Sequence, residues 1–292
     1  MAPSLHLHFT HHKCGTRWVN SIFSEVGGIL GRRWASASNP DIFGGDISNY
    51  CSENDIRLLS FTNAAYGYVS ENLSFRGFHV VRDPRDILVS SYFSSLKTHS
   101  SANWPELEPH RKQLERIPKD QGLLLEMAFI VDVFEALDTW CYEDSRILEV
   151  KMEDLMKDNY SGFLKIFSHL GLIDEGDRST SSVAVQFGDQ VRLLRNRFAE
   201  KSAFLRWLAA YPGRVSVLQL LGIVHRHRFS AKAGGRKPGR EDQGSHYRKG
   251  VAGDWRNHFT PEIEREFKAR HGDLVVKMGY ETDTNWSVDA SC

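Results

Sequence analysis

Short apolar runs alternate with longer amphipathic segments along the first part of the chain. Residues 5–9 alternate apolar and polar positions, which predicts a strand. After a glycine-containing turn, Trp18, Ile22, Val26 and Ile29 recur every three to four residues, which is the period of a helix. The Gly-Gly pair directly after Val26 predicts the end of that helix. The chain therefore opens with a strand, a loop and a helix.

Two further units repeat this arrangement. A buried-type strand is predicted over residues 78–81, with a helix entered at Asp83–Pro84, and another strand over 147–150 precedes a helix around 163–170. One long helix is predicted between these two units, over residues 122–144. Strands that alternate with helices favour an α/β fold with a parallel sheet.

The pattern changes after residue 188. A helical stretch broken at Pro212 and Gly213 leads into a glycine-rich, charged segment, residues 230–246, which is typical of a loop. Neither an internal repeat nor a linker is visible. We therefore expect residues 1–292 to form a single domain.

Composition narrows the function classes. Apolar residues make up 41% and charged residues 25% of the 292, as in ordinary globular proteins. The formal net charge is +0, which argues against a general nucleic-acid coat or a membrane-surface binder. Any anion site must therefore be local, and we expect no nucleic-acid partner.

The cysteines and the N-terminus bear on localisation. Four cysteines without C-x-x-C spacing argue against a zinc ribbon or a dense disulfide framework and favour a reducing compartment. The sequence shows no signal-peptide pattern, and no apolar stretch reaches the roughly 18 residues that a membrane span needs. We therefore expect a cytoplasmic protein without membrane insertion.

Three separate basic elements carry the candidate chemistry. The first, "HHKCGTRW", contains Lys13 and Thr16, but its lysine precedes its glycine, unlike the Walker order G-x-x-x-x-G-K-[ST]. The second joins Arg82, at a strand end, to Ser90 on the following helix. The third is "HYRKGVAGDWRNHFT", residues 246–260, in which a basic pair is followed by glycine. Together the three elements suit a ligand with two separate phosphate positions.

These segments resemble those of the PAPS-dependent sulfotransferases. "HKCGTRW" resembles the family's 5′-phosphosulfate loop P-K-S-G-T-T-W, "VVRDPRDILVSSY" its 3′-phosphate element, and "RKGVAGDWRNHFT" its R-K-G-x-x-G-D-W-K-x-x-F-T element. "EVKMEDLMKD" and "FKARHGDLVVKMGYETDTNW" also resemble family stretches, and all occur in the family's order. The resemblance implies a P-loop NTPase-like parallel sheet flanked by helices, the sulfotransferase fold, with a lid or variable acceptor region at about residues 189–245.

The resemblance also implies roles for individual residues. The donor would be 3′-phosphoadenosine 5′-phosphosulfate (PAPS), with Lys13 stabilising the leaving phosphate and Trp18 and Phe229 contacting adenine. The remaining residues implied at the 5′-phosphate are Cys14, Gly15, Thr16 and Arg17. Those implied at the 3′-phosphate are Arg82, Ser90, Arg248, Lys249 and Gly250. No carboxylate cluster for a metal is visible, so we expect no metal requirement.

The acceptor must lose a proton, and the base that the family uses is missing. Cytosolic members use a histidine in a K-T-H element, whereas Asn63 lies near that position here, and asparagine is not a general base. Candidate substitutes are His12 beside the lysine, Asp41 or Asp46 after the loop, and His99.

The sequence leaves alternative functions open. A non-catalytic PAPS- or PAP-binding module would keep the nucleotide elements and lack the base, and a P-loop kinase is a further alternative. Under the sulfotransferase interpretation the partner is a small-molecule acceptor with a hydroxyl or amine, and the protein is a monomer or homodimer.

Overall fold

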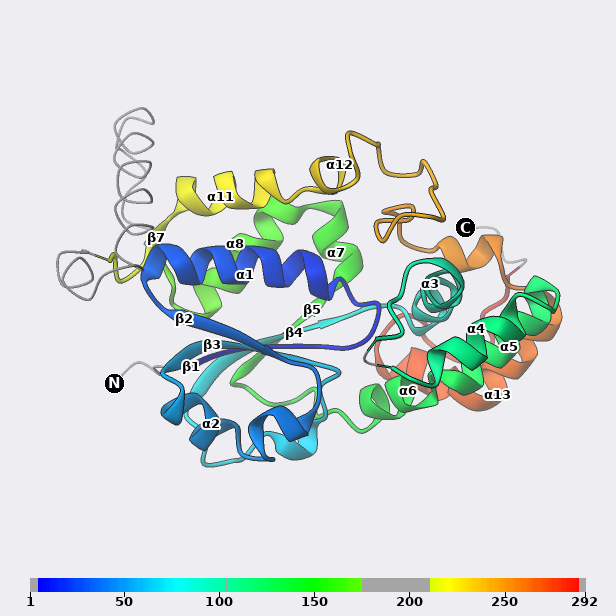
Figure 1. Cartoon of the computed structure of the whole chain (residues 1–292), viewed down its shortest axis with the longest axis horizontal. Helices are drawn as coiled ribbons and strands as arrows, with labels where there is room; N and C mark the ends of the chain where they lie inside the picture. Colours follow the sequence, from blue (N-terminus) through cyan, green and yellow to red (C-terminus); the bar gives the residue numbers. More distant parts are fainter. Residues whose placement is uncertain (1–4, 103, 175–210, 289–292) are drawn as a thin grey trace.

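A five-stranded parallel sheet forms the centre of the molecule (Figure 1). The computed structural model describes residues 5–102, 104–174 and 211–288. The strand order is β2-β3-β1-β4-β5, and every neighbouring pair is parallel, which confirms the predicted α/β class. The strands are β1 (Leu5–Thr10), β2 (Arg33–Ala37), β3 (Ile56–Thr62), β4 (Phe75–Val81) and β5 (Ile147–Lys151). A short pair, β6 (Ile173–Asp174) and β7 (Val215–Ser216), lies apart from this sheet.

Helices cover both faces and one side of the sheet (Figure 1). One face carries α1 (Thr16–Leu30), α7 (Met152–Lys157), α8 (Asn159–His169) and α11 (Val217–Arg226). The other face carries α2 (Ile47–Glu53), with the 3-10 helices η1 (Pro40–Phe43) and η2 (Tyr66–Tyr68) in the neighbouring connections. A separate group comprises α3 (Pro84–Lys97), α4 (Leu107–Leu114), α5 (Lys119–Phe129), α6 (Val131–Asp138) and α13 (Pro261–Lys277). The short α12 (Phe229–Lys232) and η3 (Asp254–Asn257) flank a long loop that reaches α3.

The apolar stripe of α1 explains how the first helix is fixed. Ile22, Phe23 and Val26 are fully buried and pack with Phe78 of β4 and Phe167 of α8. Burying each large apolar side chain stabilises the fold by about 1.5–3 kcal/mol. This packing fixes where α1 begins, and therefore the loop that joins it to β1.

Two helix boundaries differ from the prediction. Helix α1 continues past Gly27 and Gly28 to Leu30 and ends at Gly31, which has φ +63°. The predicted helix over residues 122–144 is instead two helices, α5 and α6, separated at Ile130 with φ −105° and ψ 24°. Ile130 is buried in the core between the helices, and the break lets both α5 and α6 pack against α13.

Only part of the predicted lid region can be described. Residues 189–210 lie outside the described residues. From residue 211 onward the region contains α11, which begins with a capping box formed by Ser216 and Gln219, and then α12 and the loop that leads to residue 248. None of the described helices combines the length and apolar character that a membrane span requires.

Candidate functional site

The loop between β1 and α1, residues 11–15, has an unusual backbone. Lys13 and Gly15 both adopt left-handed φ values, +66° and +78°. The turn is closed by the Cys14 amide, which donates to the His11 carbonyl at 3.2 Å, and by the Thr16 hydroxyl, which donates to the same carbonyl at 3.4 Å. Since α1 starts at Thr16, the free N–H groups of its first turn and the positive end of its dipole face this loop. The 11–15 loop can thus offer backbone N–H groups to an anion.

Gly15 is required at its position for two reasons. Its φ of +78° is one that side chains with a Cβ rarely adopt, and an added Cβ would lie 3.3 Å from the Met152 sulfur. Met152 begins α7, directly after β5. The end of β5 therefore supports the loop from the side of Gly15.

The second basic element meets this loop directly. Arg82 follows β4, and its Nη1 donates to the Lys13 carbonyl at 3.2 Å, while its Nη2 lies 3.7 Å from Asp86 Oδ2. The Arg82 side chain is buried, and its Nε has no hydrogen-bond partner among the described residues. Asp83 caps α3 by accepting from the Arg85 amide at 2.9 Å, as the sequence predicted, and half-buried Ser90 lies two turns further along α3.

Asp86 joins the third element to the second. Its carboxylate accepts from the Gly253 amide at 2.8 Å and from the Trp255 amide at 2.9 Å. Arg248 lies over the Phe93 ring of α3, with 4.5 Å from its guanidinium carbon to the ring centroid. The 246–260 segment is therefore docked on the helix that starts at Arg82, although 167 residues separate Asp86 from Gly253.

Asp254 holds the two basic side chains of the third element together. It is buried, and it accepts from both Arg248 and Lys249 as well as from Asn257. Burial acts to raise the pKa of Asp254, but the hydrogen bonds from His258, Lys249, Arg248 and Asn257 outweigh it and hold that pKa well below its usual range. Arg248 also bonds Glu241 at 2.6 Å. Ion pairs with Asp254 and Glu241 therefore hold the Arg248 and Lys249 side chains in place without a ligand.

Gly250 and Phe229 are direct neighbours. A Cβ on Gly250, whose φ is +66°, would come within 2.5 Å of the Phe229 ring. The Arg236 guanidinium lies over the Phe229 ring, with 5.5 Å from its central carbon to the ring centroid. The structure therefore places Phe229 of α12 against the third basic element.

Positive charge accumulates around Lys13. Burial, together with the nearby charges of Arg82, Arg17 and Arg248, lowers the pKa of Lys13 to about 7, with Glu126 acting in the opposite direction. Arg82 and Arg248 come from sequence elements far from the loop. Several cations that raise one another's cost of ionisation are stabilised by an anion placed between them.

Trp18 packs into the core. Its ring meets Phe163 of α8 edge-on at 5.3 Å between centroids, and it is half-buried among the α1–α8 side chains. Its Nε1 has no partner within the described part of the chain. The ring therefore has a structural role in this conformation.

Two of the predicted base candidates lie together beside Lys13. The rings of His12 and His99 are 5.2 Å apart, and both contact Trp104, at 5.7 and 5.3 Å. Burial lowers the pKa of both histidines, and the charge of Lys13 lowers each further, so both rings are neutral near pH 7. The His12 Nε2 is buried without a partner among the described residues.

A third histidine, His246, belongs to the same neighbourhood and was missed by the sequence reasoning. Burial, together with the charges of Lys13, Arg17 and His99, lowers its pKa to about 4. Its place two residues before Arg248, at the start of the third basic element, was the available signal.

The carboxylate candidates are placed differently. Asp41 lies on η1 and is exposed, and the exposed Asp46 caps α2 by accepting from the Asn49 amide at 3.0 Å. Asn63 follows β3, with φ +61°, and its amide donates to the Ser38 carbonyl at 3.2 Å. All three follow the carboxyl ends of β2 or β3, whereas His12 and His99 follow β1 and α3.

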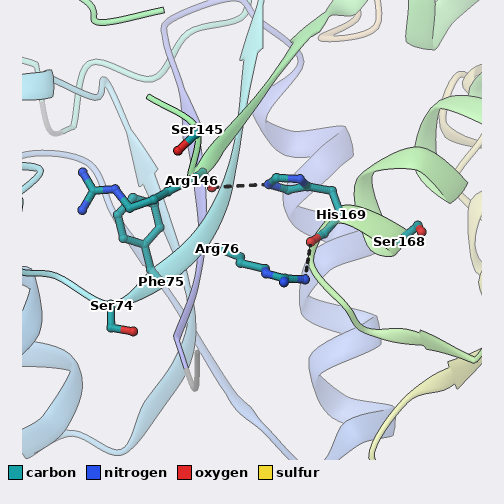
Figure 2. Close-up of a pocket in the computed structure, with 7 residues that line it drawn as sticks. All are labelled: Ser74, Phe75, Arg76, Ser145, Arg146, Ser168 and His169. Carbon is teal, nitrogen blue, oxygen red and sulfur yellow. Dashed lines mark hydrogen bonds between the residues drawn. The ribbon is translucent and has the colours of Figure 1, made fainter. Parts of the chain in front are cut away.

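A pocket of about 600 Å³ lies at the opposite end of the sheet (Figure 2). Phe75 and Arg76 at the start of β4, Arg146 before β5, and His169 at the end of α8 line it. The Arg146 guanidinium is already bound to Asp144 and to the carbonyls of Ser70, Glu71 and Leu73. This pocket is therefore at the amino edge of the parallel sheet, and the basic elements are at the carboxyl edge, where α/β folds bind ligands.

Side chains that could bind a metal ion are not clustered among the described residues. No group of three or more His, Cys, Asp or Glu side chains able to hold a metal ion occurs in the part of the chain that the structure describes.

The sequence and the structure were compared with those of known proteins. No family model and no curated protein sequence matches the chain. The crystal structure of mouse sulfotransferase SULT7A1 complexed with PAP superposes with a TM-score of 0.54 at 19% identity, covering 94% of this chain and 85% of that chain. Retinol dehydratase in complex with androsterone and inactive cofactor PAP gives a TM-score of 0.49 at 14% identity, covering 94% and 81%. The chain described here therefore has the sulfotransferase fold.

Proposed function

We propose that this protein is a sulfotransferase that moves a sulfuryl group from PAPS to a hydroxyl or amine of a small-molecule acceptor. The observation that carries the proposal is the convergence of three distant basic elements on the 11–15 loop. Arg82 bonds the Lys13 carbonyl, Asp86 bonds the segment that carries Arg248, and the fold is that of the sulfotransferases.

The residues fit the two phosphate groups of such a donor. The loop, with Gly15, Thr16 and Arg17 at the start of α1, would hold the 5′-phosphate, and half-buried Lys13 with buried Arg82 would supply the positive charge. Arg82, Ser90, Arg248, Lys249 and Gly250 would hold the 3′-phosphate. The unpartnered Arg82 Nε is a donor that such a ligand could satisfy.

Lys13 is the residue that we assign to the reacting centre. PAPS, when bound, supplies the sulfuryl group for an in-line displacement. As the sulfur–oxygen bond to the phosphate breaks, negative charge grows on the bridging oxygen, and Lys13 would stabilise that charge. Its pKa is lowered by burial and then by neighbouring cations, and an anion in the loop would favour the positively charged form.

Cys14 and the two aromatic residues would act by packing. Burial raises the pKa of the Cys14 thiol to about 12, so it stays protonated and fills space below the loop. Phe229 lies against Gly250 and would contact adenine from α12. Trp18 would contribute an edge of the same site while its ring packs on Phe163.

His12, supported by His99, is the base that we propose. Both rings are neutral and lie beside Lys13, and the unpartnered Nε2 of His12 is available to accept the acceptor's proton. Asp41 and Asp46 rank second, because Asp46 already caps α2 and both are exposed. His12→Asn should lower turnover by about 100-fold or more if the assignment holds, with PAP affinity nearly unchanged.

Calorimetry with 3′-phosphoadenosine 5′-phosphate (PAP) tests the nucleotide site. PAP should bind without magnesium and much more tightly than AMP or ATP, and Arg248→Ala should weaken PAP binding by about tenfold or more, as expected for a lost charge-assisted contact. Arg57→Ala, which removes an exposed arginine paired with Asp55, is the matched control. Equal affinity for PAP and AMP would contradict the proposal, and magnesium-dependent ATP binding would favour a kinase.

One observation keeps a second function in view. Asn63 stands at the end of β3, near the position where the resemblance implies a histidine. A chain that binds PAP but converts no hydroxyl or amine acceptor in a broad screen would be a nucleotide-binding module. Turnover that His12→Asn abolishes would establish the enzyme.

A further inference from the structure

A hydrogen-bonded chain of three titratable side chains lies behind the 11–15 loop. His11 Nε2 is 2.9 Å from His79 Nε2, and His79 Nδ1 is 2.8 Å from Glu149 Oε2. The other Glu149 oxygen accepts from Trp140 Nε1 at 3.0 Å, and the Trp140 ring lies over His79 with 4.1 Å between centroids. The proposed transfer reaction uses none of these side chains.

Strand register assembles this chain. His79 on β4 is the direct partner of Glu149 on β5, and His11 directly follows β1, the neighbour of β4 on its other side. His79 is 0% and His11 is 1% exposed, whereas the Glu149 side chain is 26% exposed. The three groups therefore run from solvent to the residue whose carbonyl closes the 11–15 loop.

The two ring contacts fix how protons are distributed. Each contact joins two atoms that need one proton between them. If Glu149 is protonated, it donates to His79 Nδ1, His79 Nε2–H donates to His11 Nε2, and His11 carries its proton on Nδ1. If Glu149 is ionised, His79 Nδ1–H donates to the carboxylate, and His11 Nε2–H donates to His79 Nε2. Both rings are neutral in each state, but their tautomers are opposite.

We propose that Glu149, His79 and His11 form a proton relay that ends beneath the 11–15 loop, in which loss of the Glu149 proton reverses the tautomer of both histidines. The three residues act through the loop and are positioning residues. His11 Nδ1, at the inner end of the relay, is buried and has no partner among the described residues, so its protonation state is set by the relay alone.

The relay also offers a way to answer an anion in the loop, and this step rests on the proposed function. Starting from protonated Glu149, the Glu149 proton can move to His79 Nδ1 while the His79 Nε2 proton moves to His11 Nε2. The result is a His11 imidazolium near the loop and a Glu149 carboxylate near solvent, with no proton taken up. When the relay has instead lost the Glu149 proton to solvent, it carries a net negative charge that would repel the nucleotide. Nucleotide binding therefore favours the relay that has kept this proton.

Burial sets the pH at which the relay loses its proton. It raises the pKa of Glu149 to about 8 and lowers that of His79 to about 3 and that of His11 well below its usual value. The titratable or charged groups that face the relay from neighbouring elements are His8, Cys14, Tyr66, Asp138, Tyr142 and Lys277, and Lys13 lies two residues after His11 in the loop. Lys13 has its own pKa of about 7, so its effect must be separated from that of Glu149.

Nitrogen-15 NMR of the full chain labelled at histidine tests the relay without any ligand. Between pH 6.5 and 9.5, the ring nitrogens of His11 and His79 should exchange their protonated and bare signatures with one common midpoint near pH 8, and neither ring should become an imidazolium. His79→Phe removes the His79 imidazole and leaves that of His11 without its ring partner, so its spectrum assigns the signals of the two histidines.

Glu149→Gln is the decisive variant. The Trp140 bond holds the amide oxygen, so the NH2 group faces His79 Nδ1 and both rings should stay in the low-pH tautomer up to pH 9.5. Glu143→Gln, an exposed carboxylate nearby, is the control and should titrate as the wild type does. Independent midpoints for the two rings, or the same tautomer exchange in Glu149→Gln, would overturn the relay.

PAP binding tests the coupling to the loop. From pH 7 to 9.5 the dissociation constant should rise about tenfold more in the wild type than in Glu149→Gln, since the charge lost from Glu149 acts on the anion through a partly screened interior. Identical pH profiles would remove the coupling. Absence of PAP binding in the wild type would instead reject the proposed function, while the ligand-free NMR result would still decide the relay.

Discussion

Lys13 combines a left-handed backbone with a cluster of like charges. Its φ of +66° costs about 1 kcal/mol in a residue with a Cβ, and three arginines lower its pKa. Unfavourable local features of this kind persist where the surrounding fold enforces them, and they are frequent at functional sites. At the scale of single residues, the unfavourable backbone and charges at Lys13 are what the proposed anion site would explain.

Replacing Lys13 should separate binding from turnover. In Lys13→Met we expect turnover to fall about 100- to 1,000-fold, because charge on the bridging oxygen loses its partner. PAP affinity should fall less, since Arg82 and Arg248 remain. Steady-state kinetics and calorimetry measure the two effects, with Lys165→Met on exposed α8 as control. A loss of affinity as large as the loss of turnover would show that Lys13 only binds.

Two glycines of the same helix should respond oppositely to alanine. Gly15→Ala meets both a positive φ and the Met152 sulfur at 3.3 Å, so we expect about 1–2 kcal/mol lower stability and weaker PAP binding. Gly28→Ala, exposed within α1 with open space around its Cα, should gain about 0.5–1 kcal/mol. Chemical denaturation measures both, and equal effects would refute the strain argument.

At the scale of elements, α3 organises the site. Its first turn carries Asp86, which bonds Arg82 and the backbone of the 253–255 segment, and its later turns carry Ser90 and the Phe93 ring under Arg248. Burial raises the pKa of Asp86, while Arg82 and the two amides oppose that rise. The helix thus holds two basic elements that the sequence places far apart.

Asp86→Asn should weaken nucleotide binding even though it removes a negative charge from a cationic site. The amide has one acceptor oxygen for two backbone donors, so one buried N–H loses its partner, at about 1–3 kcal/mol. We expect a lower melting temperature and several-fold weaker PAP binding, read by thermal shift and calorimetry. Asp132→Asn on exposed α6 is the control. Tighter PAP binding would show that charge outweighs positioning.

At the scale of the whole molecule, buried neutral histidines control acid stability. Burial lowers the pKa of His6 to about 4 and of His8 and His79 to about 3. These three rings alone therefore bind about three more protons in the unfolded chain than in the folded one between these values and about pH 6.5. Glu149 offsets about one of them above pH 4.5, because its folded pKa is raised to about 8.

Stability should consequently fall on acidification. From His6, His8, His79 and Glu149 together, about two excess protons in the unfolded state correspond to about 3 kcal/mol lost per pH unit between pH 6 and 4.5. Urea unfolding at pH 7, 6 and 5 measures this slope. In His8→Asn the slope should be shallower by about one proton, and a stability that is flat from pH 7 to 5 would contradict the proposed neutral state of these rings.

Much of the fold could be predicted because its signals are local. The strand before Lys13, the helix entry at Asp83 and the parallel class follow from periodicity and turn residues, which a short window contains. The break at Ile130 could not be predicted, since both halves have helical patterns and only packing against α13 separates them. Helix α1 continues past Gly27, which lies against the Arg32 carbonyl and the Trp34 and Leu58 side chains, and such contacts between distant residues are not visible in a local pattern.

The sequence by itself determined the order and residue types of the three basic elements and the alternation that makes a parallel sheet. These properties depend on residues close together in the chain, so the spacing of residue types is enough to predict them. Only the tertiary structure decided that His12 and His99 face each other beside Lys13, and that Asp86 joins segments 167 residues apart. The relay of His11, His79 and Glu149 depends on strand register, which is set by packing across the whole sheet and leaves no signal in any single stretch.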